Sequence, residues 1–152
     1  MLSQSGIHAI RAMVTLATLP ESEYQGVAEI ARTTGSPRNY LGKLLLQLSR
    51  HGLVESRKGL GGGFRLSQPP DEIRLFDIMA AIEDASRWTE CAFANSACSD
   101  VNPCMVHARW SRVREAFLGF LRDTTITELA NNHHPVTNTA AEREVRAALK
   151  RS

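Results

Sequence analysis

Three cysteines and one histidine form the most chemically distinctive part of this sequence. Cys91, Cys98 and Cys104 are the only cysteines of the 152-residue chain, and His107 follows them in the pattern C-x6-C-x5-C-x2-H. Thiolates bind soft metals and iron–sulfur clusters, and a neutral imidazole can take a fourth position. His107 comes one helical turn after Cys104, on the same side of a helix start. The spacing therefore predicts a metal or cluster site built from these four residues.

Other uses of the thiols stay open at this point. Structural zinc sites usually contain a C-x2-C pair, and this sequence has none. Three unrelated free thiols, or a redox pair with one spare thiol, also fit the spacing. An odd cysteine count and an N-terminus without a hydrophobic leader argue against a disulfide framework and predict a cytoplasmic protein.

Apolar spacing predicts the elements that position these residues. Helical periodicity over Gly6–Leu19, Val27–Thr34 and Ile73–Ala85 predicts three helices. A further helix is expected to open at Ser36-Pro37, with Ser36 as its cap and Pro37 as its first residue. Residues 88–102 lack periodicity and are expected to form a loop. A long helix is expected from Pro103, followed by a closing turn over residues 125–130.

The order of the first elements indicates a winged helix. Two helices joined by a tight glycine-containing turn form a helix-turn-helix. Strands over residues 53–57 and 64–67 then flank a tip with four glycines in five residues, which is typical of a β-hairpin wing. The second helix of the pair would lie in the major groove and the wing would reach the neighbouring backbone or minor groove. The predicted DNA-binding residues are Ser36, Arg38, Asn39, Tyr40, Lys43, Arg57, Lys58, Gly59 and Gly61.

The long helix from Pro103 carries an apolar seam. Its apolar residues are spaced four, three, four and three apart, which is heptad spacing. One protomer has few elements left to cover this seam, so a symmetric homodimer that places two recognition helices on a palindromic site is expected. The predicted dimer-interface residues are Val106, Trp110, Val113, Phe117 and Phe120.

Charge is unevenly distributed along the chain. Residues 1–70 carry eight Lys/Arg against four Asp/Glu, whereas residues 71–105 carry two against seven, and the whole chain has a net charge of +2. A basic first segment is a weak indication of a polyanionic partner. No catalytic set or phosphate loop stands out, so the chain is expected not to be an enzyme and not to span a membrane.

These motifs resemble the IscR/NsrR-type winged-helix regulators, the Rrf2 family. The similar segments are GIHAIRAM, SPRNYLGKLLLQLSRHGLVESRKGLGGGFRL and the cysteine–histidine pattern, and the resemblance extends to about Asn131. It implies a homodimer with a crossed dimerisation helix, operator binding, and an iron–sulfur cluster on the three cysteines. In IscR-like members a histidine at the place of His107 completes a 2Fe-2S site.

The resemblance also has departures. NsrR-like members use an acidic residue of the other subunit for a 4Fe-4S cluster, and the matching position here is Ile7, with His8 as its neighbour. This favours 2Fe-2S with His107 as the fourth ligand, with 4Fe-4S and His8 as the alternative. The first cysteine gap is six residues instead of five, and Gly42 replaces an acidic recognition residue, so no operator sequence can be transferred.

The sequence thus predicts a mainly α protein with a winged helix-turn-helix domain, a small β-hairpin wing and a long dimerisation helix. Its expected parts are residues 1–70 (DNA binding), 71–105 (connecting helix and cluster loop), 106–130 (dimerisation helix and closing turn) and 131–152 (polar tail). The expected function is a dimeric repressor-type transcription regulator of double-stranded DNA, switched by the cluster. The alternative is a same-fold regulator whose cysteines bind zinc or respond by thiol oxidation.

Overall fold

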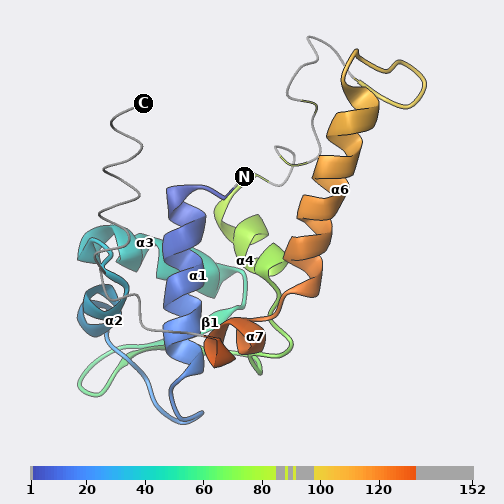
Figure 1. Ribbon diagram of the computed structural model, residues 1–152. Coiled ribbons are helices and arrows are strands. Elements are labelled where there is room, and N and C mark those ends of the chain that lie inside the picture. Colours follow the sequence, from blue (N-terminus) through green and yellow to red (C-terminus); the bar gives the residue numbers. More distant parts are fainter. Residues whose placement is uncertain (1, 85–87, 89–90, 92–97, 133–152) are drawn as a thin grey trace, which may run out of the picture.

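The computed structural model describes residues 2–84, Trp88, Cys91 and residues 98–132. Within these residues the chain is mostly helical, with one small antiparallel hairpin, and it forms a winged helix followed by a projecting helix (Figure 1). The elements are α1 (Gln4–Ala17), α2 (Val27–Thr34), α3 (Arg38–Arg50), β1 (Val54–Arg57), β2 (Gly63–Leu66), α4 (Leu75–Ile82), α6 (His107–Asp123) and α7 (Ile126–Asn131).

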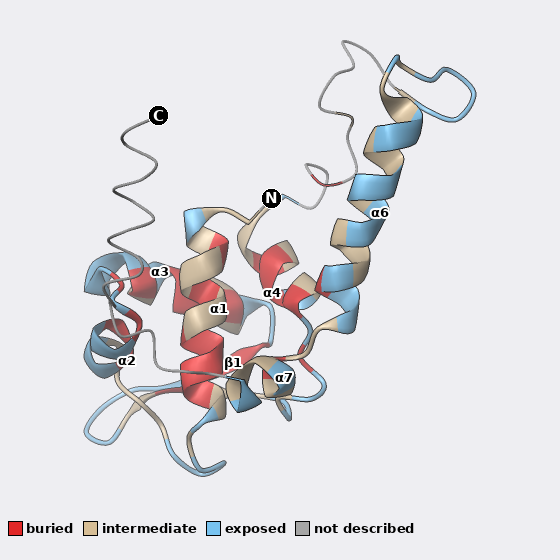
Figure 2. Ribbon diagram, in the orientation of Figure 1, coloured by how far each residue is buried: buried red, intermediate tan, exposed pale blue. Residues whose placement is uncertain are grey.

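Helix α1 lies at the centre of the core and packs against α2, α3, α4 and α7. Its N-cap is Ser3, whose hydroxyl accepts a hydrogen bond from the Gly6 N–H at 3.0 Å. Its inner face is apolar and includes two small residues, Ala9 and Ala12, that are fully buried beside the larger Met13. Small residues let the neighbouring helices approach closely, and Figure 2 shows the buried residues concentrated around this helix.

Helices α2 and α3 form the predicted helix-turn-helix. The bounds of α2 are those expected, with Gly26 as N-cap and Gly35 as a left-handed C-cap at φ 65°. The expected cap of α3 is wrong: the N-cap is Pro37, the helix begins at Arg38, and Ser36 is buried instead. The reason is tertiary, because the Ser36 hydroxyl bonds to side chains of Thr34 and α1 and so is turned away from the helix start.

The wing consists of β1 and β2, paired from Val54 opposite Leu66 to Arg57 opposite Gly63. The predicted strands are confirmed to within one residue. An isolated bridge holds the wing to the segment before α2, because the backbone of Gln25 exchanges two hydrogen bonds of 2.9 Å with Phe64. The Phe64 side chain is itself buried. The wing is therefore held by the segment that precedes the helix-turn-helix and by the chain that follows it.

Helix α4 was predicted over residues 73–85. The structure describes this stretch of the chain as far as residue 84, and the helix extends only from Leu75 to Ile82. Ile73 and Arg74 are extended, because Arg74 bridges Thr125 and the Ile73 carbonyl accepts the Ile126 N–H at 2.9 Å. Trp88 falls in the predicted loop but is helical and 6% exposed, and its ring meets Phe76 edge-on at 5.9 Å. The sequence pattern missed this part of the core.

Helix α6 begins at His107, not at Pro103 as predicted. Residues 104–106 form a turn instead, in which the Cys104 carbonyl accepts the His107 N–H at 3.0 Å. The helix projects from the body with its first turns farthest from α1, α2 and α3 (Figure 1). It packs on α4 near its C-terminal end, and within α6, which is described in full, Leu121 alone is buried.

The expected closing turn is a helix, α7. Thr125 caps it in a capping box with Glu128, and Ile126 is fully buried. The polar tail was predicted over residues 131–152. Of these, residues 133–152 lie outside the described residues. The division of the chain at residues 70, 105 and 130 therefore stays a prediction. No helix among the described residues is long and apolar enough to cross a membrane.

Candidate DNA-binding face and cysteine centre

The first turns of α3 present a polar surface. Its apolar side, which includes Leu41, Leu45 and Leu48, is fully buried. Arg38, Asn39, Tyr40 and Lys43 are all exposed in the first two turns. Burial of the leucines fixes the helix rotation, so Asn39 and Lys43 lie opposite the core, and Arg38 and Tyr40 lie on the two flanks. Four of the five predicted residues at this helix are therefore exposed; the fifth, Ser36, is buried.

The start of α3 is held by polar side chains of α1. His8 Nδ1 lies 2.6 Å from Ser36 Oγ, and Thr34 Oγ1 donates to the same oxygen at 2.8 Å. Ser5 Oγ hydrogen-bonds Tyr40 Oη, and the His8 ring meets the Tyr40 ring edge-on at 5.9 Å. The contacts made by α1 join residues at least 28 positions apart, so no local sequence signal could reveal them. They fix how α3 presents its N-terminus.

The wing carries a stacked arrangement of arginines around one tyrosine. The guanidinium carbons of Arg57 and Arg65 lie 5.8 and 4.8 Å from the centre of the Tyr24 ring. Arg65 also forms an ion pair of 2.8 Å with Glu55, which accepts a hydrogen bond from the Tyr24 hydroxyl. The hydrogen bond and charge of Arg65 hold the pKa of Glu55 below its usual value, and Glu55 raises the pKa of Arg65.

This arrangement leaves the predicted wing cations available. Among the described residues, the salt bridges neutralise Arg65 but involve neither Arg57 nor Lys58, and both of these are exposed. At the tip, Gly59 and Gly61 have φ values of 91° and 72°, a backbone region that favours glycine. Tyr24 was not predicted as a site residue, because it lies thirty positions before the wing.

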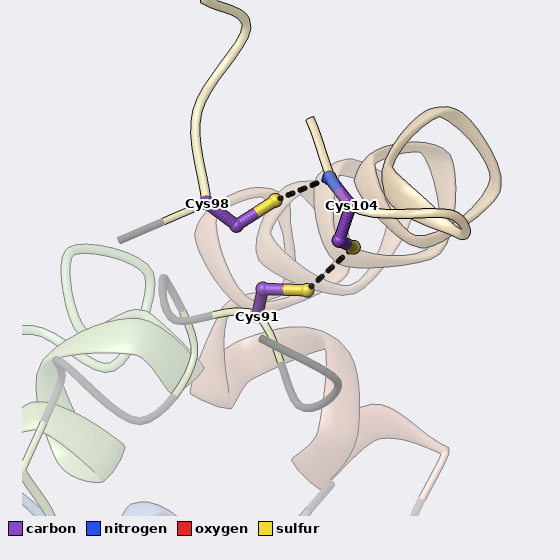
Figure 3. A group of neighbouring side chains, drawn as sticks. All are labelled: Cys91, Cys98 and Cys104. Carbon is purple, nitrogen blue, oxygen red and sulfur yellow. Dashed lines mark hydrogen bonds between the residues drawn. The ribbon is translucent and has the colours of Figure 1, made fainter. Parts of the chain in front are cut away.

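The three cysteine thiols converge on one point. Their sulfur atoms all lie within 4.8 Å of one another, and all three thiols are free and partly buried. Cys91 Sγ and Cys104 Sγ are 3.4 Å apart, and Cys98 Sγ accepts the Cys104 N–H at 3.4 Å (Figure 3). Cys104 lies just before α6 and the other two precede it in the chain, so the centre forms at the free end of that helix.

His107 is the fourth polar group of this centre. Its Nδ1 is 3.0 Å from Cys98 Sγ, and its Nε2 is 2.9 Å from a carboxylate oxygen of Asp100. A carboxylate is one of the common partners of the second ring nitrogen in metal-binding histidines. The alternative ligand, His8, lies in α1 and hydrogen-bonds Ser36 instead. The group of mutually close ligand atoms consists of the three cysteines, and His107 contacts it through Cys98.

The donor set suits a soft metal or an iron–sulfur cluster. Three convergent thiols with an imidazole nitrogen beside one of them supply sulfur and nitrogen ligands. The predicted residues Cys91, Cys98, Cys104 and His107 are thus brought together. Asp100 was not predicted, although its place two residues after Cys98 was a usable signal.

The residues that the structure describes cover the apolar seam of α6 only in part. Val113 is 57% and Phe120 47% exposed, whereas Phe117 packs on the core. Trp110 is half-buried, and Val106 is the N-cap residue. The exposed part of the seam is a candidate self-association surface.

Comparisons with known proteins agree on one family. A family model described as an iron-dependent transcriptional regulator, Rrf2, matches residues 2–132. The transcriptional regulator IscR of Cronobacter sakazakii is 31% identical over 131 residues, which cover 86% of this chain and 80% of the relative. The structure of CymR, the global cysteine regulator of B. subtilis, superposes with a TM-score of 0.72 at 28% identity, over 88% of this chain and 98% of that one. An oxidised form of Staphylococcus aureus CymR gives 0.68 at 27% identity, over 86% and 95%.

Proposed function

The chain belongs to the Rrf2 family of transcriptional regulators, and from that premise we propose that it is a dimeric operator-binding protein whose DNA affinity depends on what its cysteine centre holds. The observation that carries the DNA-binding part is the exposure of the polar residues at the start of α3 and of the cations of the wing. Arg38 and Asn39 occupy the start of α3, where side chains reach base edges in the major groove. Arginine can read guanine and asparagine adenine through paired hydrogen bonds.

The wing supplies contacts that position the protein on the duplex. Arg57 and Lys58 are exposed beside the glycine tip, so they can meet phosphates or the minor groove without desolvating an existing ion pair. Because two copies related by a two-fold axis present two recognition helices, the operator is proposed to be palindromic. The exposed Val113 and Phe120 of α6 support the dimer. A cytoplasmic location belongs to the same proposal.

At the cysteine centre we propose a 2Fe-2S cluster held by Cys91, Cys98, Cys104 and His107. IscR among the relatives, the three convergent sulfurs and the His107–Cys98 contact support this assignment. Such a cluster, when bound, supplies a redox-active and chemically labile group. Iron–sulfur, iron or nitrosative stress control fits this chemistry. The chain's own residues respond by fixing or releasing the segment before α6.

A route to the DNA-binding face starts at Glu83, the C-cap of α4. Glu83 accepts hydrogen bonds from the N–H of Ser3, at 3.2 Å, and from its hydroxyl. Ser3 caps α1, and α1 holds the start of α3 through His8 and Ser36. We propose that a shift of the segment after Glu83 alters this cap, and through it α3. The coupling free energy between the cysteine centre and DNA is then set by the difference in DNA affinity between the two conformations.

A second candidate is a regulator of the same fold that responds by thiol oxidation or binds zinc. The CymR relatives, one of them known in an oxidised form, favour the thiol response. The close approach of Cys91 and Cys104 favours it as well. Absorption spectroscopy separates this second candidate from the cluster-bound regulator, because zinc and free thiols are colourless in the visible range.

The decisive experiment uses anaerobically purified full-length protein. Iron, sulfide and the visible spectrum are measured first, and bound sequences are then selected from random double-stranded oligonucleotides at fixed salt. Titration of the selected DNA with cluster-loaded and cluster-free protein should give dissociation constants that differ at least about fivefold. Equal constants would refute the switch, whereas no selected sequence would refute operator binding. Glu83→Gln should bring the two constants closer together.

A further inference from the structure

The three thiols of the cysteine centre are not equivalent. Cys91 Sγ and Cys104 Sγ face each other at 3.4 Å, as Figure 3 shows. Cys98 Sγ is directed at two nitrogen groups instead, the Cys104 N–H at 3.4 Å and His107 Nδ1 at 3.0 Å. Two thiols are thus arranged as a pair and the third is held by partners that are not thiols.

From this arrangement we infer that Cys91 and Cys104 are a specific modification site, which closes to an intramolecular disulfide when the metal-free protein meets a hydroperoxide. Bonded sulfurs lie about 2.05 Å apart, so the two atoms need to approach by roughly 1.4 Å. A change of side-chain torsion at one or both cysteines provides a movement of this size. Both thiols are partly buried and not fully enclosed, so a small peroxide can reach them.

The chemistry balances with hydrogen peroxide as the two-electron oxidant. One thiolate attacks a peroxide oxygen, the O–O bond breaks, and a sulfenic acid and one water form. The second thiol, as its thiolate, attacks the sulfenic sulfur. The S–S bond forms, the S–O bond breaks, and the hydroxide leaves as water with the thiol proton. In total two thiols are oxidised, and one peroxide is reduced to two waters.

The specificity for this pair does not depend on which thiol reacts first. All three sulfurs lie within 4.8 Å of one another, so a third thiol can attack a newly formed disulfide and move the bond. Exchange then selects the most favourable pair. Cys98 loses its contacts with His107 and the Cys104 N–H if it enters the bond, whereas the Cys91–Cys104 bond leaves both in place.

The bond would have a regulatory consequence. It removes two of the proposed ligands and closes a loop between residues 13 positions apart, immediately before α6. The oxidised protein therefore cannot regain metal until a thiol reductant opens the bond. This inference deepens the thiol-response candidate and uses the cysteine centre, but it does not require that the metal be an iron–sulfur cluster.

The test uses full-length protein freed of metal with a chelator under anaerobic conditions and then treated with equimolar hydrogen peroxide. Reactive thiols should fall from three to one. Cleavage after Phe93 and before Asp100 separates the three cysteines onto different peptides, so mass spectrometry without reductant identifies the pair directly. The expected product links Cys91 to Cys104 and leaves Cys98 open to alkylation. Dithiothreitol should restore all three thiols.

Matched variants sharpen the result. Cys98→Ser should still lose two thiols, whereas Cys91→Ser and Cys104→Ser should give no Cys91–Cys104 bond. A linked peptide that contains Cys98 in the wild-type protein overturns the inference. Cluster loading and DNA titration on the same unoxidised preparation are read separately. Disulfide formation without cluster uptake refutes the cluster proposal alone, and cluster uptake with a different disulfide refutes the inference alone.

Discussion

A carboxylate oxygen of Asp100 lies 2.9 Å from Nε2 of His107, and the other ring nitrogen of His107 faces Cys98 at 3.0 Å. This contact fixes the ring orientation, because a carboxylate on Nε2 leaves Nδ1 directed at the sulfur. The His107 side chain is 16% exposed, whereas Asp100 is fully exposed. Asp100 is therefore a positioning residue for the proposed fourth ligand.

Asp100→Asn should weaken metal binding without abolishing it. Loss of an outer partner of a metal-binding histidine typically lowers affinity about 10- to 100-fold. The measurement is the rate at which a chelator removes iron from the anaerobic protein, followed by visible absorption. Asp71→Asn, which changes an exposed acid far along the chain, is the matched control. Equal rates for the wild type and Asp100→Asn would show that the carboxylate does not support the site.

Ser36→Ala should destabilise the protein although the change is small. The hydroxyl of Ser36 is buried and bonds to His8 and Thr34, so its removal leaves polar atoms without partners. The expected loss is about 1–3 kcal/mol in the free energy of unfolding, measured by urea denaturation. Ser56→Ala, at an exposed position of β1, should change stability much less. Equal losses for the two variants would contradict the importance of the His8–Ser36 contact.

Local chemistry made much of this fold predictable. Apolar spacing and glycine caps gave α2 its bounds to the residue, and the glycine-rich tip placed both wing strands within one residue. These elements are determined by neighbours in the sequence. The convergence of the three cysteines was also predicted, because they lie in a short segment before a helix.

Long-range contacts account for most of what the sequence did not reveal. Ser36 is of a residue type that often caps helices, but its hydroxyl is hydrogen-bonded to His8, 28 positions away. The first turn predicted from Pro103 is replaced by a turn whose Cys104 N–H bonds to Cys98 Sγ. Arg74 pairs with Thr125 and shortens α4. In each case a partner from elsewhere in the chain competes with the local preference.

Arg57→Ala should weaken binding to the selected DNA at all sequences by a similar factor. If Arg57 contacts a phosphate, its loss should reduce the slope of log affinity against log salt by about 1. Arg38→Ala should act differently and relax discrimination at one base pair, at a cost of about 1–3 kcal/mol. Arg112→Ala on α6 is the control. An unchanged salt slope for Arg57→Ala would remove the wing from the proposed phosphate contacts.

The pair of Glu55 and Arg65 predicts a small acid-dependent effect in the wing. The pKa of Glu55 is lowered by its hydrogen bond and charge interaction with Arg65, so the folded state favours the carboxylate. Its stabilisation is present above the unfolded-state pKa and is lost as pH falls through the lower folded-state pKa. A carbon NMR titration of the Glu55 carboxyl should give a midpoint below that of an unperturbed glutamate. Arg65→Ala should return it towards the usual range, and an identical midpoint in both proteins would contradict the pairing.

Phe120→Glu and Val113→Glu should dissociate the proposed dimer. Both side chains are about half exposed on α6, although they are apolar and follow the heptad seam. A symmetric interface contains each substituted residue twice, so the change removes apolar burial at two places and adds the cost of burying two charges. We expect the dimer dissociation constant, from sedimentation equilibrium, to rise at least about tenfold, which corresponds to roughly 1.4 kcal/mol.

Ala108→Glu lies on the opposite, exposed side of the same helix and should leave the constant unchanged. Because Leu121 is the buried anchor of α6 in its own chain, Phe120→Glu should alter the unfolding free energy of the monomer little. A dimer of wild-type affinity in both seam variants would mean that the seam is covered by something other than a second copy.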